Sequence, residues 1–300
     1  MRAMPFFIGR LYMEDITMLP EEIVAAIIEC KNKTWEEDQL QTEFPNLLLR
    51  EDVLELLDRY CTVIYYPLLD EKENNGFHIT GILDIKGNEK HFVFINTAQT
   101  MEKQVFTAAH ELGHIWEVDE YVKECCDVVL DNRLRELIMN RFAAELLIPK
   151  EQFYASFRSE YEKFKNDESS ITVANMLKVI VALMNQFFVP RKSIILRCVE
   201  LKIISEKTAE LLLGMGAISG DVIETRINEI IRDNGYIKFQ KPSEKKWIEG
   251  LAELLDYAEE TKAVTQSKID HMRETFELSP QSAADEQMDE VMKIEGRGYE

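Results

Sequence analysis

The stretch 106–116, FTAAHELGHIW, constrains this chain more than any other. It places His110 and His114 four residues apart, with Glu111 directly after the first histidine. In a helix, residues four apart lie on one face, so both imidazoles can bind one metal ion. Glu111 is turned about 100 degrees away, where it can flank the ion without binding it. This is the H-E-x-x-H pattern, which predicts zinc ligands at His110 and His114 and a general base at Glu111.

A third ligand is expected from the next predicted helix, because catalytic zinc usually takes three protein ligands and leaves a fourth position open. The stretch 131–149, DNRLRELIMNRFAAELLIP, predicts that helix. Glu136 and Asn140 share one of its faces. We expect Glu136 to bind the metal and Asn140 to hydrogen-bond the second nitrogen of a ligand histidine. Three further acids stay open as alternative donors: Asp127, Asp131 and Glu145.

The residues before this motif change their periodicity twice. The stretches 19–32 and 50–61 show helical spacing, whereas 62–70 and 76–98 are extended, and Gly87-Asn88 predicts a hairpin turn. A helix is expected from about residue 100 to 116. The pattern predicts an α+β domain that ends near residue 150, with a small antiparallel sheet packed on the helix that carries the two histidines.

The predicted hairpin contains two pairs of residues that bear on the site. An extended substrate can add to the strand HFVFINT, so Phe94 and Asn96 are candidate substrate-binding residues. His78 and His91 are left out of the site, because histidines in strands usually lie at the surface or in packing contacts.

The second half of the chain reads as mainly helical. Residues 151–240 predict a helical module with a break at Val189-Pro190, and residues 241–300 predict a C-terminal helix and a mobile acidic tail. A run of basic residues has two interpretations: a solvated face of a small helical bundle, which is favoured, or a helix-turn-helix-like bundle that docks a repressor or DNA. These residues are Lys178, Arg191, Lys192, Arg197 and Lys202.

Composition excludes some classes of function. A formal net charge of -20 disfavours general binding to nucleic acid or to anionic membranes. The five cysteines form no C-x-x-C pair, which is typical of reduced thiols in a cytoplasmic protein. The first twenty residues do not resemble a signal peptide, and the apolar stretches are too short to span a membrane. We therefore expect a cytoplasmic protein.

The stretch INTAQTMEKQVFTAAHELGHIW, followed by NRFAAELLIP, resembles the ImmA/IrrE family of metallopeptidases over roughly residues 20 to 150. The resemblance implies a thermolysin-like (zincin) fold and zinc-dependent endopeptidase activity. Such enzymes typically cleave a helix-turn-helix repressor of a mobile element, a prophage or a stress response. The family often shows Glu-x-Glu-Ala-Asn before Phe-Ala. Here Glu136 keeps the first acid, and Ile138 replaces the second.

Two hypotheses about function follow. The first is a zinc endopeptidase acting on a specific regulatory protein. The second is a non-catalytic zinc-binding anti-repressor, or a toxin-antitoxin component, that works by sequestration. The intact Glu111 favours the enzyme, because a pure binding protein needs no base there, while Ile138 favours the second hypothesis. A zinc-stabilised DNA-binding regulator is a third alternative, which the net charge opposes.

Overall fold

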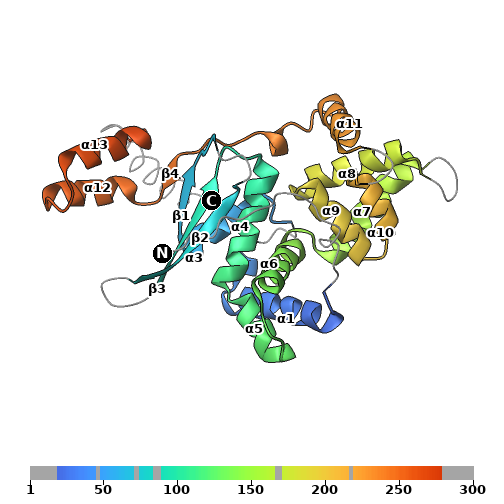
Figure 1. The fold of residues 1–300 in the computed structure, drawn as a ribbon, viewed down its shortest axis with the longest axis horizontal. Coiled ribbons are helices and arrows are strands. Elements are labelled where there is room, and N and C mark those ends of the chain that lie inside the picture. Colours follow the sequence, from blue (N-terminus) through green and yellow to red (C-terminus); the bar gives the residue numbers. More distant parts are fainter. Residues whose placement is uncertain are drawn as a thin grey trace, which may run out of the picture.

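A small mixed sheet packed on one long helix forms the centre of the molecule (Figure 1). The computed structural model describes residues 19–278, except 45–47, 71–73, 84–88, 166–170 and 216–218. The predicted hairpin turn at Gly87-Asn88 and the predicted mobile tail both lie outside these residues. The α+β class expected from the sequence is confirmed.

The four strands lie in the order β2-β3-β1-β4. Their bounds are Thr62–Tyr66 for β1, Gly76–Leu83 for β2, Glu89–Asn96 for β3 and Trp247–Ile248 for β4. The β2–β3 pair is antiparallel, as a hairpin requires, but β1 runs parallel to β3. The predicted antiparallel sheet is therefore wrong for this pair. Alternating residues define the two faces of a strand, but they do not encode which distant strand it meets or in which direction.

Helix α4, Met101–Ile115, carries the two motif histidines and lies against β2 and β3. Its predicted limits are confirmed to within one residue at each end, and Thr100 holds the extended backbone of an N-cap. The helix is buried on nearly every side, including the polar residues Gln104, His110 and Glu111. A helix with so little exposed surface has to be covered by other elements. Besides the sheet, it contacts helix α3, Asp52–Tyr60, and helix α6, Asn132–Leu147.

Helices α5, Val118–Cys126, and α6 contact α4, and α1, Glu21–Glu37, packs against both of them (Figure 1). Helix α6 begins as expected, since the Asp131 side chain accepts a hydrogen bond from the Leu134 N–H at 2.7 Å. The short helix α2 spans Leu40–Glu43.

Residues after 149 form further helices, and their apolar side chains join the same core as the sheet and α4. The predicted break at Val189-Pro190 is confirmed, because α8 ends at Phe187 and α9 begins at Arg191. The bounds are Lys150–Phe164 for α7, Val173–Phe187 for α8, Arg191–Glu200 for α9, Glu206–Leu212 for α10 and Gly220–Asp233 for α11. These helices lie beyond α4 and α6 as seen from the sheet (Figure 1).

The segment after α11 returns to the sheet. A short 3-10 helix, η2, spans Lys238–Gln240, and the Thr97 hydroxyl then donates to the Lys245 carbonyl at 2.8 Å. Trp247 and Ile248 pair with β1 as strand β4, and the helix expected in the C-terminal region begins after them, at Leu251. Helices α12, Leu251–Glu260, and α13, Gln266–Thr275, pack on each other in a small second core.

In the described part of the chain, no single helix is long and apolar enough to cross a bilayer. Helices α8 and α9 together have that length and apolar content, but the pair is bent by 106°.

Candidate metal centre

Helix α4 presents His110 and His114 on one face, as their spacing predicts. Their ring centroids lie 5.1 Å apart. His110 is 2% exposed, whereas His114 is half-buried. Burial lowers the pKa of His114 to about 3, and the neighbouring charges of His110, His78 and Arg135 act in the same direction. His114 is therefore neutral at physiological pH, which is the form of imidazole that binds a metal.

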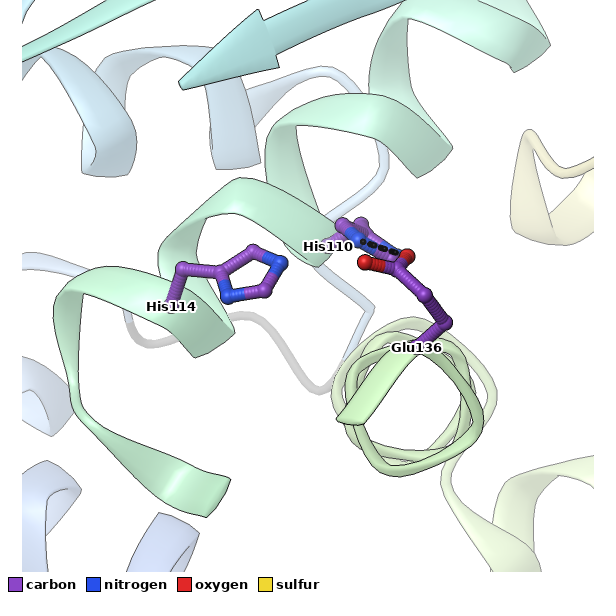
Figure 2. Close-up of side chains that lie close together, drawn as sticks. All are labelled: His110, His114 and Glu136. Atoms are coloured by element: carbon purple, nitrogen blue, oxygen red, sulfur yellow. Dashed lines mark ion pairs between the residues drawn. The ribbon is translucent and has the colours of Figure 1, made fainter. Parts of the chain in front are cut away.

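Helix α6 brings a carboxylate to the same place. The Glu136 Oε2 lies 3.4 Å from the His110 Nε2. One ligand atom from each of His110, His114 and Glu136 can be chosen so that all three lie within 4.8 Å of one another. Figure 2 shows the three side chains converging from the two helices. Two imidazoles and one carboxylate are the donor set of a catalytic zinc site that leaves room for a fourth ligand.

Asn140, one turn after Glu136 on α6, contacts the other nitrogen of His110. Its side-chain oxygen lies 3.1 Å from the His110 Nδ1. An amide oxygen can only accept, so this Nδ1 carries the proton and donates it, which leaves the Nε2 lone pair facing Glu136. The structure thus places Asn140 where the sequence predicts it, behind a candidate metal ligand.

Glu111 is fully buried beside this group. Neither of its carboxylate oxygens has a hydrogen-bond partner among the described residues. Burial is the main cause that raises its pKa to about 7, with the charge of His110 acting to lower it and that of Glu136 to raise it. Burying a carboxylate without a partner is costly, and a bound cation would offset that cost. The residues therefore fit a divalent metal ion with a carboxylate next to it.

Comparison with known protein families agrees with this geometry. Residues 62–189 match the model of the IrrE N-terminal-like domain, a peptidase family. The resemblance to the ImmA/IrrE family is thereby confirmed over this segment, and the family suggests a function of the metallopeptidase type. The match begins later than residue 20 and continues past residue 150, so it includes α7 and α8. No curated protein matches the chain.

Ile138 replaces the second acid of the family pattern, but this replacement takes no carboxylate away from the candidate metal centre. Ile138 is 0% exposed and belongs to the hydrophobic core. Residues two apart on a helix point to different faces, so a side chain at 138 is turned away from the face that carries Glu136 and Asn140. Here the first acid of the family pattern is the one that reaches the two histidines.

The alternative donors are engaged elsewhere in the domain. Glu145 accepts two hydrogen bonds from Arg197, and Asp131 caps α6. Neither belongs to the candidate metal group of the described residues, and neither does Asp127.

The structure places Phe94 and Asn96 away from the role expected for them. Phe94 stacks on Phe77 at 4.9 Å, and Asn96 is 0% exposed. The Asn96 side chain accepts from the Leu68 N–H at 2.9 Å and donates to the Asn74 carbonyl at 2.7 Å. Strand β3 also pairs on both sides, with β2 and β1, so no peptide can add to it. The expected substrate strand is wrong, and this placement does not favour substrate contact by Phe94 or Asn96.

Two histidines that the sequence analysis left out lie next to the centre. The His78 ring centroid is 6.2 Å from that of His114, and His78 Nε2 is 3.1 Å from His91 Nδ1. The alternation of residues in the strands could have predicted this position. His91 shares a face with Val93 and Ile95, and that apolar face packs on α4.

Gly113 sets the separation between the two helices of the centre. A Cβ at this position would lie 2.8 Å from the Met139 Sδ and 2.9 Å from a ring carbon of Phe142, both on α6. Gly113→Ala is expected to destabilise the fold by about 1–3 kcal/mol through overpacking. The higher helix propensity of alanine offsets about 1 kcal/mol of this loss. Zinc affinity is expected to fall with it, since Glu136 moves with α6. Urea unfolding and a chelator-competition titration measure both effects.

The matched control for this variant is Gly220→Ala on α11, where the nearest atom to a new Cβ is the Gly214 carbonyl oxygen at 3.9 Å. It is expected to leave both quantities unchanged. A Gly113→Ala protein with wild-type stability and zinc affinity would contradict this account of the helix spacing.

Proposed function

We propose that this chain is a zinc-dependent endopeptidase that cleaves a specific regulatory protein, a helix-turn-helix repressor. The observation that carries the proposal is the convergence of His110, His114 and Glu136 beside the buried, unpartnered carboxylate of Glu111. A protein that only binds a partner would not need a costly buried acid next to its metal ligands. The presence of Glu111 as a base and the position of Glu136 next to the two histidines both favour catalysis over sequestration.

The chemistry divides between the ion and the chain. Bound zinc would supply a Lewis acid for the scissile carbonyl and would lower the pKa of a water molecule to about 7. Glu111 would take the proton of that water and deliver it to the leaving amine. Its own pKa of about 7 reflects burial, and the positive charge of an ion would lower it, so the base is ionised when it is needed.

The edge of the sheet offers a place for the substrate backbone. Strand β2 is the last strand on its side of the sheet, so one row of its backbone groups has no neighbouring strand within the described residues. An extended peptide can pair with such an edge. His78 lies on this strand and close to His114, so a peptide paired with β2 would pass beside the metal centre.

A protein substrate fits the chain better than nucleic acid. Arg197, one of the basic residues expected on a docking surface, is 1% exposed, and most of α9 around it is buried. Arg191 is paired with Glu224. The burial of Arg197 and the net charge of -20 over the whole chain both disfavour DNA as a partner. The helix-turn-helix repressor remains the substrate class that the family resemblance implies.

The test is co-expression of the full chain with helix-turn-helix repressors encoded near its gene, followed by assays with purified protein. Fragments are expected from the zinc-loaded protein. Removal of zinc with a chelator is expected to stop cleavage, because the carbonyl then lacks its Lewis acid, and added zinc should restore it. An intact repressor that co-purifies with the chain would favour sequestration. A repressor neither cut nor bound would rule out this substrate class.

A further inference from the structure

Helices α12 and α13 form a small unit that the proposed chemistry does not use. They lie beside the sheet, apart from the other helices (Figure 1). Their side chains pack on each other in the second core, which includes Leu251, Leu255 and Ile269. Both helices follow residue 189, where the match to the IrrE N-terminal-like domain ends. The unit therefore lies outside the matched segment, and its exposed surface needs an explanation of its own.

The sheet holds this unit in a defined place. Strand β4 leads into α12 and pairs with β1. Phe276 of α13 lies against Tyr66 of β1, with ring centroids 5.7 Å apart. Lys246, directly before β4, forms an ion pair with Glu277 at 2.5 Å. The surface of α12 is therefore presented in a fixed position relative to the sheet, and a preorganised surface binds a partner at a lower entropic cost.

The solvent face of α12 exposes two large apolar side chains. Leu254 is 62% exposed and Tyr257 is 63% exposed. They are three residues apart, so they are neighbours on one face, away from the residues that enter the second core. Each of the other exposed large apolar side chains that the structure describes lies on a different helix or loop. Single exposed apolar residues are normal, but an adjacent pair is a candidate contact surface.

Acidic residues surround this pair. Helix α12 carries four acidic residues, all exposed, and no lysine or arginine. Glu253 lies four residues before Tyr257 and Glu260 three residues after it, so both flank the tyrosine. The other two acids pair with Arg273 of α13. An apolar centre with a charged rim is the usual anatomy of a protein interface. We call this surface the α12 face, formed by Glu253, Leu254, Tyr257 and Glu260.

A positively charged helix of a DNA-binding protein is the partner whose chemistry fits the α12 face. Helix-turn-helix proteins place a recognition helix in the major groove and contact phosphates through lysine and arginine. Such a surface is complementary in charge to the acidic rim and to the net charge of -20. A second copy of this chain would bring two acidic rims together, because a symmetric interface uses the same patch twice.

We propose that the α12 face docks the basic DNA-binding surface of the substrate repressor. The inference rests on the proposed function, which identifies the partner as a helix-turn-helix repressor. The same basic surface cannot contact operator DNA and α12 at once, so the chain captures the repressor that is free of DNA. Tyr257 is the anchor of this contact, since tyrosines are enriched among the residues that dominate binding energy.

The test measures binding of purified repressors, encoded near the gene of this chain, to the zinc-loaded full chain by biolayer interferometry. The chain carries Glu111→Gln, so that the repressor stays intact. The double variant Leu254→Ser with Tyr257→Ser is expected to weaken binding by about 10- to 100-fold, because the apolar centre is lost. The matched control is Val222→Ser with Ile237→Ser, which removes two exposed apolar side chains elsewhere. Urea unfolding is expected to be unchanged in both, since these side chains are exposed.

Two further measurements test the chemistry of the partner. Glu253→Gln with Glu260→Gln is expected to lower the association rate by about 2- to 10-fold and to reduce its dependence on salt, because rim charges steer the encounter. A duplex that carries the operator of the repressor is expected to compete with the chain. A repressor that binds the chain equally well on and off its operator would overturn the inference.

The remaining outcomes separate this inference from the proposed function. Unchanged affinity in Leu254→Ser with Tyr257→Ser would refute docking on the α12 face and leave cleavage untouched. A wild-type dimer that this variant converts to a monomer, measured by sedimentation, would assign the face to a second copy and refute the inference as well. A wild-type chain that binds none of the repressors would also refute it. A repressor that docks on the α12 face but is never cut by the zinc-loaded wild type would refute the proposed function and support the inference.

Discussion

Replacing Glu111 by glutamine is expected to lower the rate of repressor cleavage by about 10²- to 10⁴-fold while the zinc content stays at the wild-type value. Glutamine has nearly the same shape as glutamate but cannot take a proton. Glu111 is not among the residues that can hold the ion, so His110, His114 and Glu136 are untouched by the change. Cleavage rates and metal analysis of the same purified sample measure the two quantities.

The stability of this variant separates a catalytic role from a structural one. Both Glu111 oxygens are buried without a hydrogen-bond partner in the described part of the chain, so the carboxylate contributes nothing to folding through such bonds. We expect the metal-free Glu111→Gln protein to unfold at the same urea concentration as the wild type, or at a higher one. Glu124→Gln, at an exposed position on α5, is the control. A Glu111→Gln protein that cleaves at the wild-type rate would show that another group is the base.

Local patterns in the sequence predicted the parts of the site that lie on helices. The spacing of His110 and His114 defines a shared face whatever the rest of the fold does, and the same holds for Glu136 and Asn140 on α6. Pairing those two faces required one further assumption, that α6 packs against α4. The structure supplies that information at Gly113, where a Cβ would lie 2.8 Å from the Met139 Sδ on α6.

The sheet was less predictable, because its pairings join distant residues. Strand β1 pairs with β3, although β2 lies between them in the sequence. Strand β4 comes from residues 247–248, far along the chain. Neither pairing leaves a mark in the periodicity of the strands involved. The error had a consequence for function, since the position of the free edge decides where a peptide can bind. With β3 inside the sheet, the edge belongs to β2, and His78 moves from an incidental strand residue to a neighbour of His114.

The basic residues of the second half show a different limit. A count of charges along the sequence cannot separate a surface arginine from a buried one. Arg197 was grouped with a possible docking surface, yet it lies inside the protein between α9 and α6. Its partner is Glu145, one of the acids that the sequence leaves open as an alternative metal donor. The two residues form a buried ion pair, so neither a surface role for Arg197 nor a metal-binding role for Glu145 is favoured.

Replacing Arg197 by methionine is expected to lower the free energy of unfolding by about 3–5 kcal/mol. Its guanidinium donates to both oxygens of Glu145 at 3.0 Å, to the Ile148 carbonyl at 3.1 Å and to Glu200 at 3.0 Å. Methionine fills similar space but leaves the buried Glu145 with Arg141 as its remaining partner. The Arg197 charge also helps to hold the pKa of Glu145 below its usual value, so the variant should raise that pKa. Urea unfolding of the full chain measures the loss.

Two controls distinguish the buried position from the loss of an arginine as such. Arg226→Met removes an arginine whose pair with Glu229 is exposed on α11, and an exposed pair contributes at most about 1 kcal/mol. The double variant Arg197→Met with Glu145→Met removes both buried charges and should recover much of the lost stability, because most of the cost comes from leaving one charge behind. A double variant as unstable as Arg197→Met alone would mean that the hydrogen bonds to Ile148 and Glu200, and not the ion pair, hold α9 against α6. In either case α6 carries Glu136, so the packing of α9 on α6 helps to hold this candidate metal ligand in place.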